Sequence, residues 1–195
     1  MNGTDMSLLR YRFRKSGYNT YQFSYKSTKN TPSDNAQKLS EFINLIQSKK
    51  IHFVCHSLGG LVLRHYLNLN SPQQPGNIVM LGTPNQTSII ARTLIKWSLG
   101  KKLLGKSIEN GLTGKLPKWD KNLKLGIIAG RFPLASGLFL PIIKNTNDGT
   151  VSVEETRLDG SIDHITLYQT HLGLLFSKKV FLQTKHFLEH SCFIR

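Results

Sequence analysis

The feature that most constrains this chain is a strand-to-helix junction near residue 57. The apolar run IHFVC at 51–55 has the length and composition of a strand that is buried on both faces of a parallel sheet. The turn HSLGG leads directly into 58–69, a segment with the apolar periodicity of a helix. A buried strand followed at once by a helix is half of a βαβ unit, so the junction predicts an α/β fold.

The same alternation continues along the chain. We expect further strands at 18–25, 77–81, 124–130 and 165–170, and helices at 4–16, 35–48 and 177–189. Strands separated by helices favour a mostly parallel sheet flanked by helices, in one domain over 1–195. Residues 86–123 do not continue the alternation of strands and helices. This stretch is long and basic and holds both Trp97 and Trp119. We interpret it as a cap or lid-like insertion over the sheet.

Ser57 occupies the turn between the strand and the helix. A serine in such a sharp turn projects its hydroxyl at the carboxyl edge of the sheet, where ligands bind in open α/β folds. The turn needs small neighbours, which Gly59 and Gly60 supply, whereas Cys55 stands where glycine is usual. The amide of Leu58, at the start of the helix, is placed to stabilise an oxyanion. Ser57 is therefore the candidate nucleophile, and the alternative is a helix start without chemistry.

A serine nucleophile needs a base, and the base needs an acid that orients it. His171 directly follows the strand at 165–170, which places it at the same sheet edge as Ser57. Asp148 lies in an Asn-Asp-Gly turn after the strand at 124–130, again at that edge. An ordinary turn is the alternative for this tripeptide, because all three residue types favour turns. The chain order serine, aspartate, histidine is that of one known arrangement of the three groups.

Other ionisable residues near these segments fit less well. His164 and Asp163 precede the strand at 165–170, and a six-residue strand spans about 20 Å. Both therefore lie at the wrong end of the sheet to act on the serine. Glu154 and Glu155 are the fallback acids.

Four segments together resemble a known family. They are HFVCHSLGGLVLRHYL (52–67), IVMLGTPNQTS (78–88), NDGTVSVEETRL (147–158) and THLGLLFSKKV (170–180). The chain is similar to the α/β-hydrolase superfamily, in particular to bacterial lipases and esterases related to triacylglycerol lipases and GPI inositol-deacylases. The resemblance implies an α/β-hydrolase fold with Ser57, Asp148 and His171 as catalytic triad. It also implies the Leu58 amide as one oxyanion donor, no metal and no organic cofactor.

The resemblance stops at the amino end. Enzymes of this kind begin with a buried strand ending in His-Gly, and the loop after it gives the second oxyanion amide. This chain begins at Met1-Asn2-Gly3, just past that element. The loss of one oxyanion donor lowers the rate by about 10²–10³. We expect an N-terminally truncated form of the fold. Either the true start lies upstream, or the product is weakly active or a non-catalytic binding protein.

The net charge of +15 is unevenly distributed. Residues 92–131 hold ten Lys and Arg against two acids, which favours an anionic partner, and a solvated basic face is the alternative. No nucleic-acid motif is recognisable, so we expect no nucleic acid. Residues 88–106 place Ile90, Leu94 and Trp97 on one side of a helix. Such a basic amphipathic lid could rest on an anionic membrane.

These features together predict a serine hydrolase of carboxylic esters, with lipid or long-chain acyl esters as substrates. His56 points away from the nucleophile, and we expect it, with Trp97, to contact the substrate. The two cysteines, Cys55 and Cys192, form no disulfide framework, which favours a reducing compartment. With no signal core and no 18-residue apolar stretch, the expected location is cytoplasmic, with peripheral membrane contact.

Overall fold

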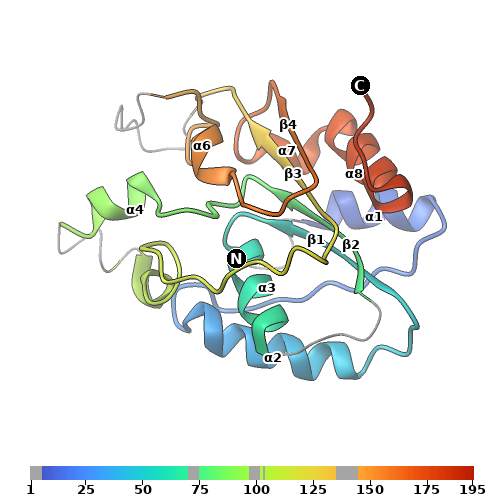
Figure 1. Ribbon diagram of the computed structural model, residues 1–195, viewed down its shortest axis with the longest axis horizontal. Helices are drawn as coiled ribbons and strands as arrows, with labels where there is room; N and C mark the ends of the chain where they lie inside the picture. The colour runs from blue at the N-terminus through green and yellow to red at the C-terminus, as the bar shows by residue number, and fades with distance from the viewer. Residues whose placement is uncertain (1–5, 70–74, 97–101, 103, 135–144) are drawn as a thin grey trace.

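The computed structural model describes residues 6–69, 75–96, 102, 104–134 and 145–195. Within these residues, one parallel sheet has the strand order β1-β2-β3-β4 (Figure 1). The strands are β1 (Ile51–His56), β2 (Pro75–Leu81), β3 (Leu125–Gly130) and β4 (Asp163–Leu167). The helices are α1 (Ser7–Lys15), α2 (Pro32–Asn44), α3 (Leu58–Leu69), α4 (Ile89–Leu94), α6 (Val153–Thr156), α7 (Gly173–Phe176) and α8 (Lys178–His190), with the 3₁₀ helix η2 (Gly105–Ile108). This is the α/β architecture that the alternation of strands and helices predicts.

Helices cover both faces of the sheet. Successive side chains of a strand point to opposite faces, so each strand contributes to the packing on both sides. In β2, Ile78 and Met80 pack with α2 and α3, whereas Val79 and Leu81 pack with α1 and α8. All four side chains are fully buried. The first core is completed by Ala36, Leu39, Val62, Leu63 and Tyr66, and the second by Leu9, Phe13, Val180, Phe181 and Phe187.

The predicted helices at 4–16, 58–69 and 177–189 are confirmed to within a few residues as α1, α3 and α8. The α2 helix differs, because it begins at Pro32 and ends at Asn44, whereas the apolar pattern indicated 35–48. Its start is fixed by a capping box between Thr31 and Asp34, with proline in the first turn. The capping residues extend the helix beyond its apolar stripe.

The segment 18–25 was predicted as a strand, and this prediction is wrong. The chain there carries no regular secondary structure, although partly buried and exposed positions largely alternate. Phe23 and Tyr25 pack on the core formed with α2 and α3, but Tyr21, expected on the same side, is 58% exposed. A strand needs a neighbour to pair with, and among the described residues β1 is paired on one side only, by β2. As a result Ile51–Cys55 are only half-buried rather than buried on both faces.

Two further boundaries differ from the sequence predictions. The last strand covers Asp163–Leu167 rather than 165–170, because its pairing with β3 ends where Gly130 faces Leu167. Of the segment 88–106, α4 covers Ile89–Leu94, and Gly105, one of two glycines expected to weaken a helix here, turns the chain with a φ of +55° against the carbonyl of Thr28. Trp97 lies outside the described residues.

The assignment of 86–123 as an insertion stays a prediction, although Trp119 is buried in the core with α2 and α3. No helix in the described part of the chain is long and apolar enough to span a bilayer.

Candidate active site

Ser57 stands at the turn between β1 and α3 in a left-handed backbone conformation, with a φ of +52°. This conformation costs a residue with a side chain about 1–3 kcal/mol and is maintained only by its surroundings. Two hydrogen bonds hold it: the Ser57 amide donates to the Leu81 carbonyl at 2.9 Å, and the Thr83 hydroxyl donates to the Ser57 carbonyl at 3.0 Å. The turn is therefore anchored to the end of β2.

The two glycines after Ser57 are not equivalent. A β-carbon at Gly60 would collide with the side chain of Thr83, which bonds the serine carbonyl. A β-carbon at Gly59 would meet its nearest neighbour, the Tyr25 hydroxyl, at an ordinary 3.6 Å. Only Gly60 is therefore required by the packing of the turn.

The structure brings Asp148 and His171 together as a buried pair. His171 Nδ1 lies 2.7 Å from Asp148 Oδ2, and the His171 amide donates to the Asp148 carbonyl at 2.8 Å. Because a carboxylate accepts the hydrogen bond, Nδ1 carries the proton and Nε2 is left as the basic nitrogen. The other carboxylate oxygen, Oδ1, accepts from the amides of Thr150 and Val151 at 2.9 and 2.7 Å. Asp148 is 0% exposed, so these contacts fix its orientation.

The serine turn and this pair meet at the carboxyl edge of the sheet. His56, the residue before Ser57, donates from Nε2 to the carbonyl of His171 at 3.0 Å, and the two imidazole rings are 4.6 Å apart. Gly82 follows β2, and a β-carbon there would lie 3.1 Å from both Asp148 Oδ2 and His171 Nδ1. The segments expected to form one site are therefore neighbours in space.

Gly82 and Gly130 were missed by the sequence interpretation. Gly82 has a φ of +54° and directly underlies the pair, whereas Gly130, the last residue of β3, leaves room for the β-carbon of Asp148. The available signal was a glycine that directly follows or closes each of two apolar runs, NIVML and LGIIA. Glycine at the end of a buried strand indicates a close approach of another chain segment.

His56 is buried at 4% exposure and has a strongly lowered pKa. Burial is the main cause, and the nearby His171 adds to it, so that the pKa of His56 falls to about 3. Its Nε2 must carry a proton to donate to the His171 carbonyl, and its buried Nδ1 has no hydrogen-bond partner among the described residues. What the structure shows for His56 is a contact with the main chain of His171. The predicted substrate contact of His56 stays a prediction.

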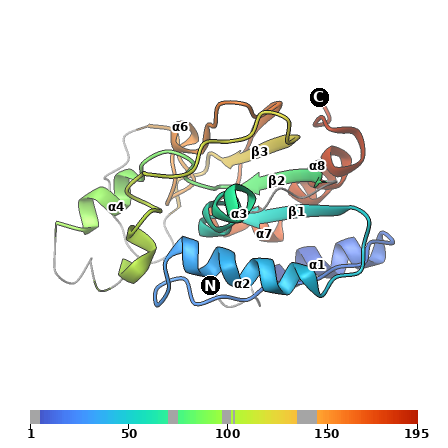
Figure 2. The same cartoon turned by 60° about the horizontal axis from the view of Figure 1, so that its bottom comes forward.

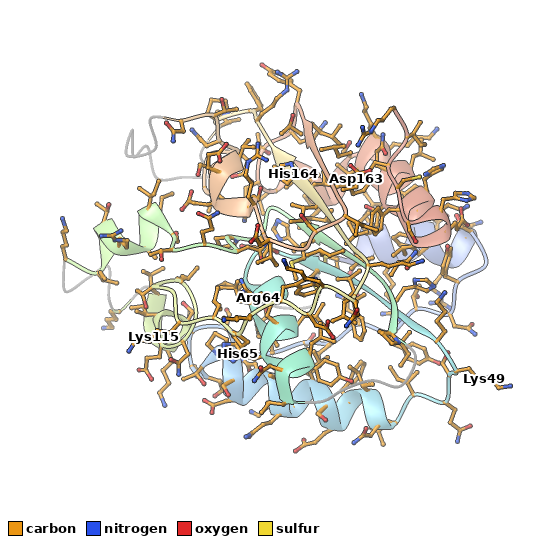
Figure 3. The ribbon with its side chains drawn as sticks, viewed as in Figure 1. Lys49, Arg64, His65, Lys115, Asp163 and His164 are labelled. Carbon is orange, nitrogen blue, oxygen red and sulfur yellow. The ribbon has the colours of Figure 1, made fainter. Side chains whose placement is uncertain are left out.

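The acids and the histidine that the sequence analysis judged less suitable for the site have other partners. Glu155 accepts the amides of Ile89 and Ser152 at 2.6 and 2.7 Å, and Glu154 pairs with Arg157 at the surface. Asp163 and His164 lie on β4 (Figure 3). Asp163 accepts the amide of Phe193 at 2.8 Å and pairs with Arg195, and His164 bonds the Thr156 hydroxyl at 2.9 Å.

A buried arginine supports the loop after β2. Arg64 and His65 lie on α3 (Figure 3), and the Arg64 guanidinium donates to the carbonyls of Asn85 and Pro117. Burial lowers the pKa of Arg64 to about 10. The Asn85 amide in turn donates to the Thr156 carbonyl at 2.9 Å. These contacts tie the loop after β2 to the segment at Pro117 and to the last residue of α6, and no local sequence pattern indicated them.

The other predicted site groups are Leu58 and Trp97. Leu58 is the first residue of α3 and directly follows Ser57, and its role as an oxyanion donor stays a prediction. Trp97 falls outside the described residues. No three His, Cys, Asp or Glu side chains in the described part of the chain are grouped so as to hold a metal ion.

Comparison with known proteins finds similarity in structure only. No family model and no curated protein sequence matches the chain. The mature lipase BlEst2 of Bacillus licheniformis is similar, with a TM-score of 0.67 and 21% identity over 97% of this chain and 84% of that one. Phospholipase PlaB of Legionella pneumophila is also similar, with a TM-score of 0.57 and 18% identity over 80% of this chain and 42% of that one. The methylesterase MES16 of Arabidopsis has a TM-score of 0.55 and 13% identity over 91% of this chain and 89% of that one.

At these identities the similarity shows the fold alone. The chain has an α/β fold with a parallel sheet flanked by helices that matches α/β-hydrolase structures, as the sequence resemblance predicted.

Proposed function

We propose that this chain is a serine hydrolase of carboxylic esters that forms an acyl-enzyme on Ser57. The observation that carries the proposal is the buried pair of Asp148 and His171, joined at 2.7 Å beside a serine turn with a φ of +52°. Hydroxyl nucleophiles are activated by a histidine that a carboxylate orients, and His56, the neighbour of Ser57, contacts such a histidine.

In the proposed reaction, Ser57 Oγ attacks the ester carbonyl carbon while His171 Nε2 takes the hydroxyl proton. Asp148 stabilises the imidazolium that forms, and the amide of Leu58 donates to the oxyanion. When the carbon–oxygen bond to the alcohol breaks, the imidazolium gives its proton to the leaving oxygen. Water then attacks the acyl-enzyme with the same proton transfers, releases the acid and restores the serine.

The substrate class we propose is lipid or long-chain acyl esters. It is supported by the fold shared with a lipase and a phospholipase, and by the basic stretch at 92–131, which suits an anionic lipid surface. Sedimentation with anionic and with neutral vesicles at low salt tests the surface contact. Binding to the anionic vesicles alone is expected, and equal binding or no binding to both overturns this part of the proposal.

The test of the catalytic proposal is labelling with a fluorophosphonate probe. We expect labelling of the intact chain that disappears in Ser57→Ala and His171→Ala. Ser191→Ala is a matched control, because Ser191 shares the left-handed conformation with a φ of +62° but follows α8. Labelling that persists in Ser57→Ala overturns the proposal. A folded chain that fails to label under any condition favours the second candidate, a binding protein that keeps the fold without turnover. The observation in favour of this candidate is that β1 pairs on one side only among the described residues.

A further inference from the structure

Helices α1, α7 and α8 share one face of the sheet and contact one another (Figure 2). The Arg12 guanidinium donates to the carbonyl of Phe176 at 2.9 Å, which joins α1 to α7. The rings of Phe13 and Phe181 meet edge to face at 5.0 Å and join α1 to α8. The outer sides of the three helices therefore adjoin. We call the following exposed residues on them the α1–α7–α8 surface: Tyr11, Arg14, Lys15, Leu172, Phe176, Lys178, Lys179 and Leu182.

This surface is basic because the sequence around it contains no acids. No Asp or Glu occurs between residues 6 and 33 or between residues 164 and 188. Over the same stretches α1 carries four Arg or Lys residues, and α8 carries three lysines. In the described part of the chain, the one ion pair on these helices joins Lys185 to Glu189 at 2.6 Å, near the end of α8. The other positive charges lack an acidic partner there, so the surface attracts anions.

Large apolar side chains are exposed among these charges. The four on the surface are between 45% and 57% exposed: Tyr11, Leu172, Phe176 and Leu182. On α8, Leu182 lies on the same side as Lys178 and Lys179, because residues three and four apart are neighbours on a helix. On α1, Lys15 Nζ lies 5.8 Å from the centre of the Tyr11 ring. Apolar and cationic groups therefore alternate over the whole surface.

A lipid bilayer with anionic head groups matches both components. Its phosphates and carboxylates attract the cations, and the apolar layer just below them receives aromatic and leucine side chains. An acidic protein would match the charges but would leave the apolar side chains without a matching environment. The combination therefore favours a membrane over an acidic protein.

The surface also begins beside the candidate site. Leu172 directly follows His171 and precedes the first residue of α7, and Phe176 is the last residue of that helix. A membrane in contact with these two side chains would lie next to the carboxyl edge of the sheet, where Ser57 and the pair of Asp148 and His171 meet.

We propose that the α1–α7–α8 surface docks on an anionic membrane. Leu172 and Phe176 enter the bilayer between the head groups, and Lys15, Lys178 and Lys179 contact the anionic head groups. That the docked protein takes its ester from this membrane rests on the proposed function, whereas the docking itself is independent of it.

The first test is co-sedimentation at low salt with vesicles of phosphatidylcholine and phosphatidylserine in equal parts. Each cation close to an anionic surface strengthens binding by about five-fold. The triple variant Lys15→Gln, Lys178→Gln, Lys179→Gln should therefore bind about 100-fold more weakly than the wild type. Unchanged binding of this variant overturns the inference.

A second triple variant separates the surface from net charge. Lys49→Gln, Lys50→Gln, Lys124→Gln removes the same charge from exposed residues at the amino ends of β1 and β3. We expect this variant to bind like the wild type. An equal loss of binding in both triple variants means that net charge alone drives binding, and it overturns the inference.

The second test is insertion of the apolar side chains. In Phe176→Trp, lipids brominated on their acyl chains should quench the new fluorescence. The matched control is Leu45→Trp, because Leu45 is 82% exposed at the end of α2, which packs on the other face of the sheet. Quenching of both variants alike or of neither overturns the inference. Binding to polyglutamate as tight as binding to vesicles, without quenching, identifies an acidic protein as the class of partner and also overturns it.

A third measurement keeps docking apart from catalysis. In the first triple variant, hydrolysis of an ester carried in the vesicles should fall about as much as binding, whereas fluorophosphonate labelling of Ser57 in solution should not change. Equal loss of labelling means that the variant damages the site and overturns the assignment of these lysines to docking. Docking of a wild-type chain that never labels at Ser57 confirms the surface and overturns the esterase instead.

Discussion

The buried His56 makes a specific prediction about acid stability. Burial, and then the proximity of the His171 ring, lower the pKa of His56 from 6.5 to about 3. Between these two pH values the unfolded chain binds a proton that the native chain does not bind. The stability that the neutral ring confers is therefore fully present above pH 6.5 and decreases as the pH falls toward 3. One pH unit corresponds to about 1.4 kcal/mol, so two units remove about 3 kcal/mol.

The perturbation that isolates this contribution is His56→Gln. A glutamine amide can donate to the carbonyl of His171, which accepts from His56 Nε2 at 3.0 Å, but it does not titrate. The assay is urea unfolding of both proteins between about pH 7.5 and pH 4.5. All carboxylates are common to the two proteins, so the difference in the free energy of unfolding reports His56. We expect the wild type to lose about 3 kcal/mol relative to the variant between about pH 7.5 and pH 4.5. A difference that stays constant with pH would refute the reasoning.

Three further substitutions test the packing and the site. Gly60→Ala should destabilise the fold by about 1–3 kcal/mol in thermal or urea unfolding, because its β-carbon collides with a buried threonine, and it should also reduce labelling of Ser57. Gly59→Ala, whose β-carbon meets only an ordinary contact, should have a much smaller effect on both. Asn77→Leu should lower the free energy of unfolding by about 1–3 kcal/mol, because this side chain donates at 3.0 Å to three acceptors at the end of α8, and equal stability to the wild type would contradict the assignment. Asp148→Asn should retain the fold by circular dichroism but lower ester turnover by about 10⁴-fold, since an amide favours the wrong imidazole tautomer; unchanged turnover would exclude this residue as the orienting acid.

The periodicity of apolar residues predicted the elements that are packed on a continuous core. Runs such as NIVML and the stripe of α3 are long, and each residue in them is buried by neighbours that the fold guarantees. The proposed site could be assembled from the sequence for the same reason. The carboxyl ends of parallel strands meet at one edge, so residues that follow those strands become neighbours whatever the loop conformation.

The sequence did not reveal the contacts that join distant segments. The hydrogen bond between His56 and the His171 carbonyl spans 115 positions, and that between Arg64 and the Asn85 carbonyl depends on where two loops cross. At segment 18–25 the local pattern predicted too much. Its alternation is typical of a strand, but a strand also needs a neighbour to pair with, and the sequence of the segment does not say whether one is present.

The main chain of His171 is held on both sides, since its N–H donates to Asp148 and its carbonyl accepts from His56, while its ring is bonded to the Asp148 carboxylate. The conformational entropy of this residue is therefore lost when the protein folds. In the proposed ester hydrolysis, the orientation of His171 does not have to be ordered again when a substrate binds, so binding energy would be left for positioning the ester. Substitutions that loosen either main-chain contact should act on the entropy of activation more than on the affinity for substrate.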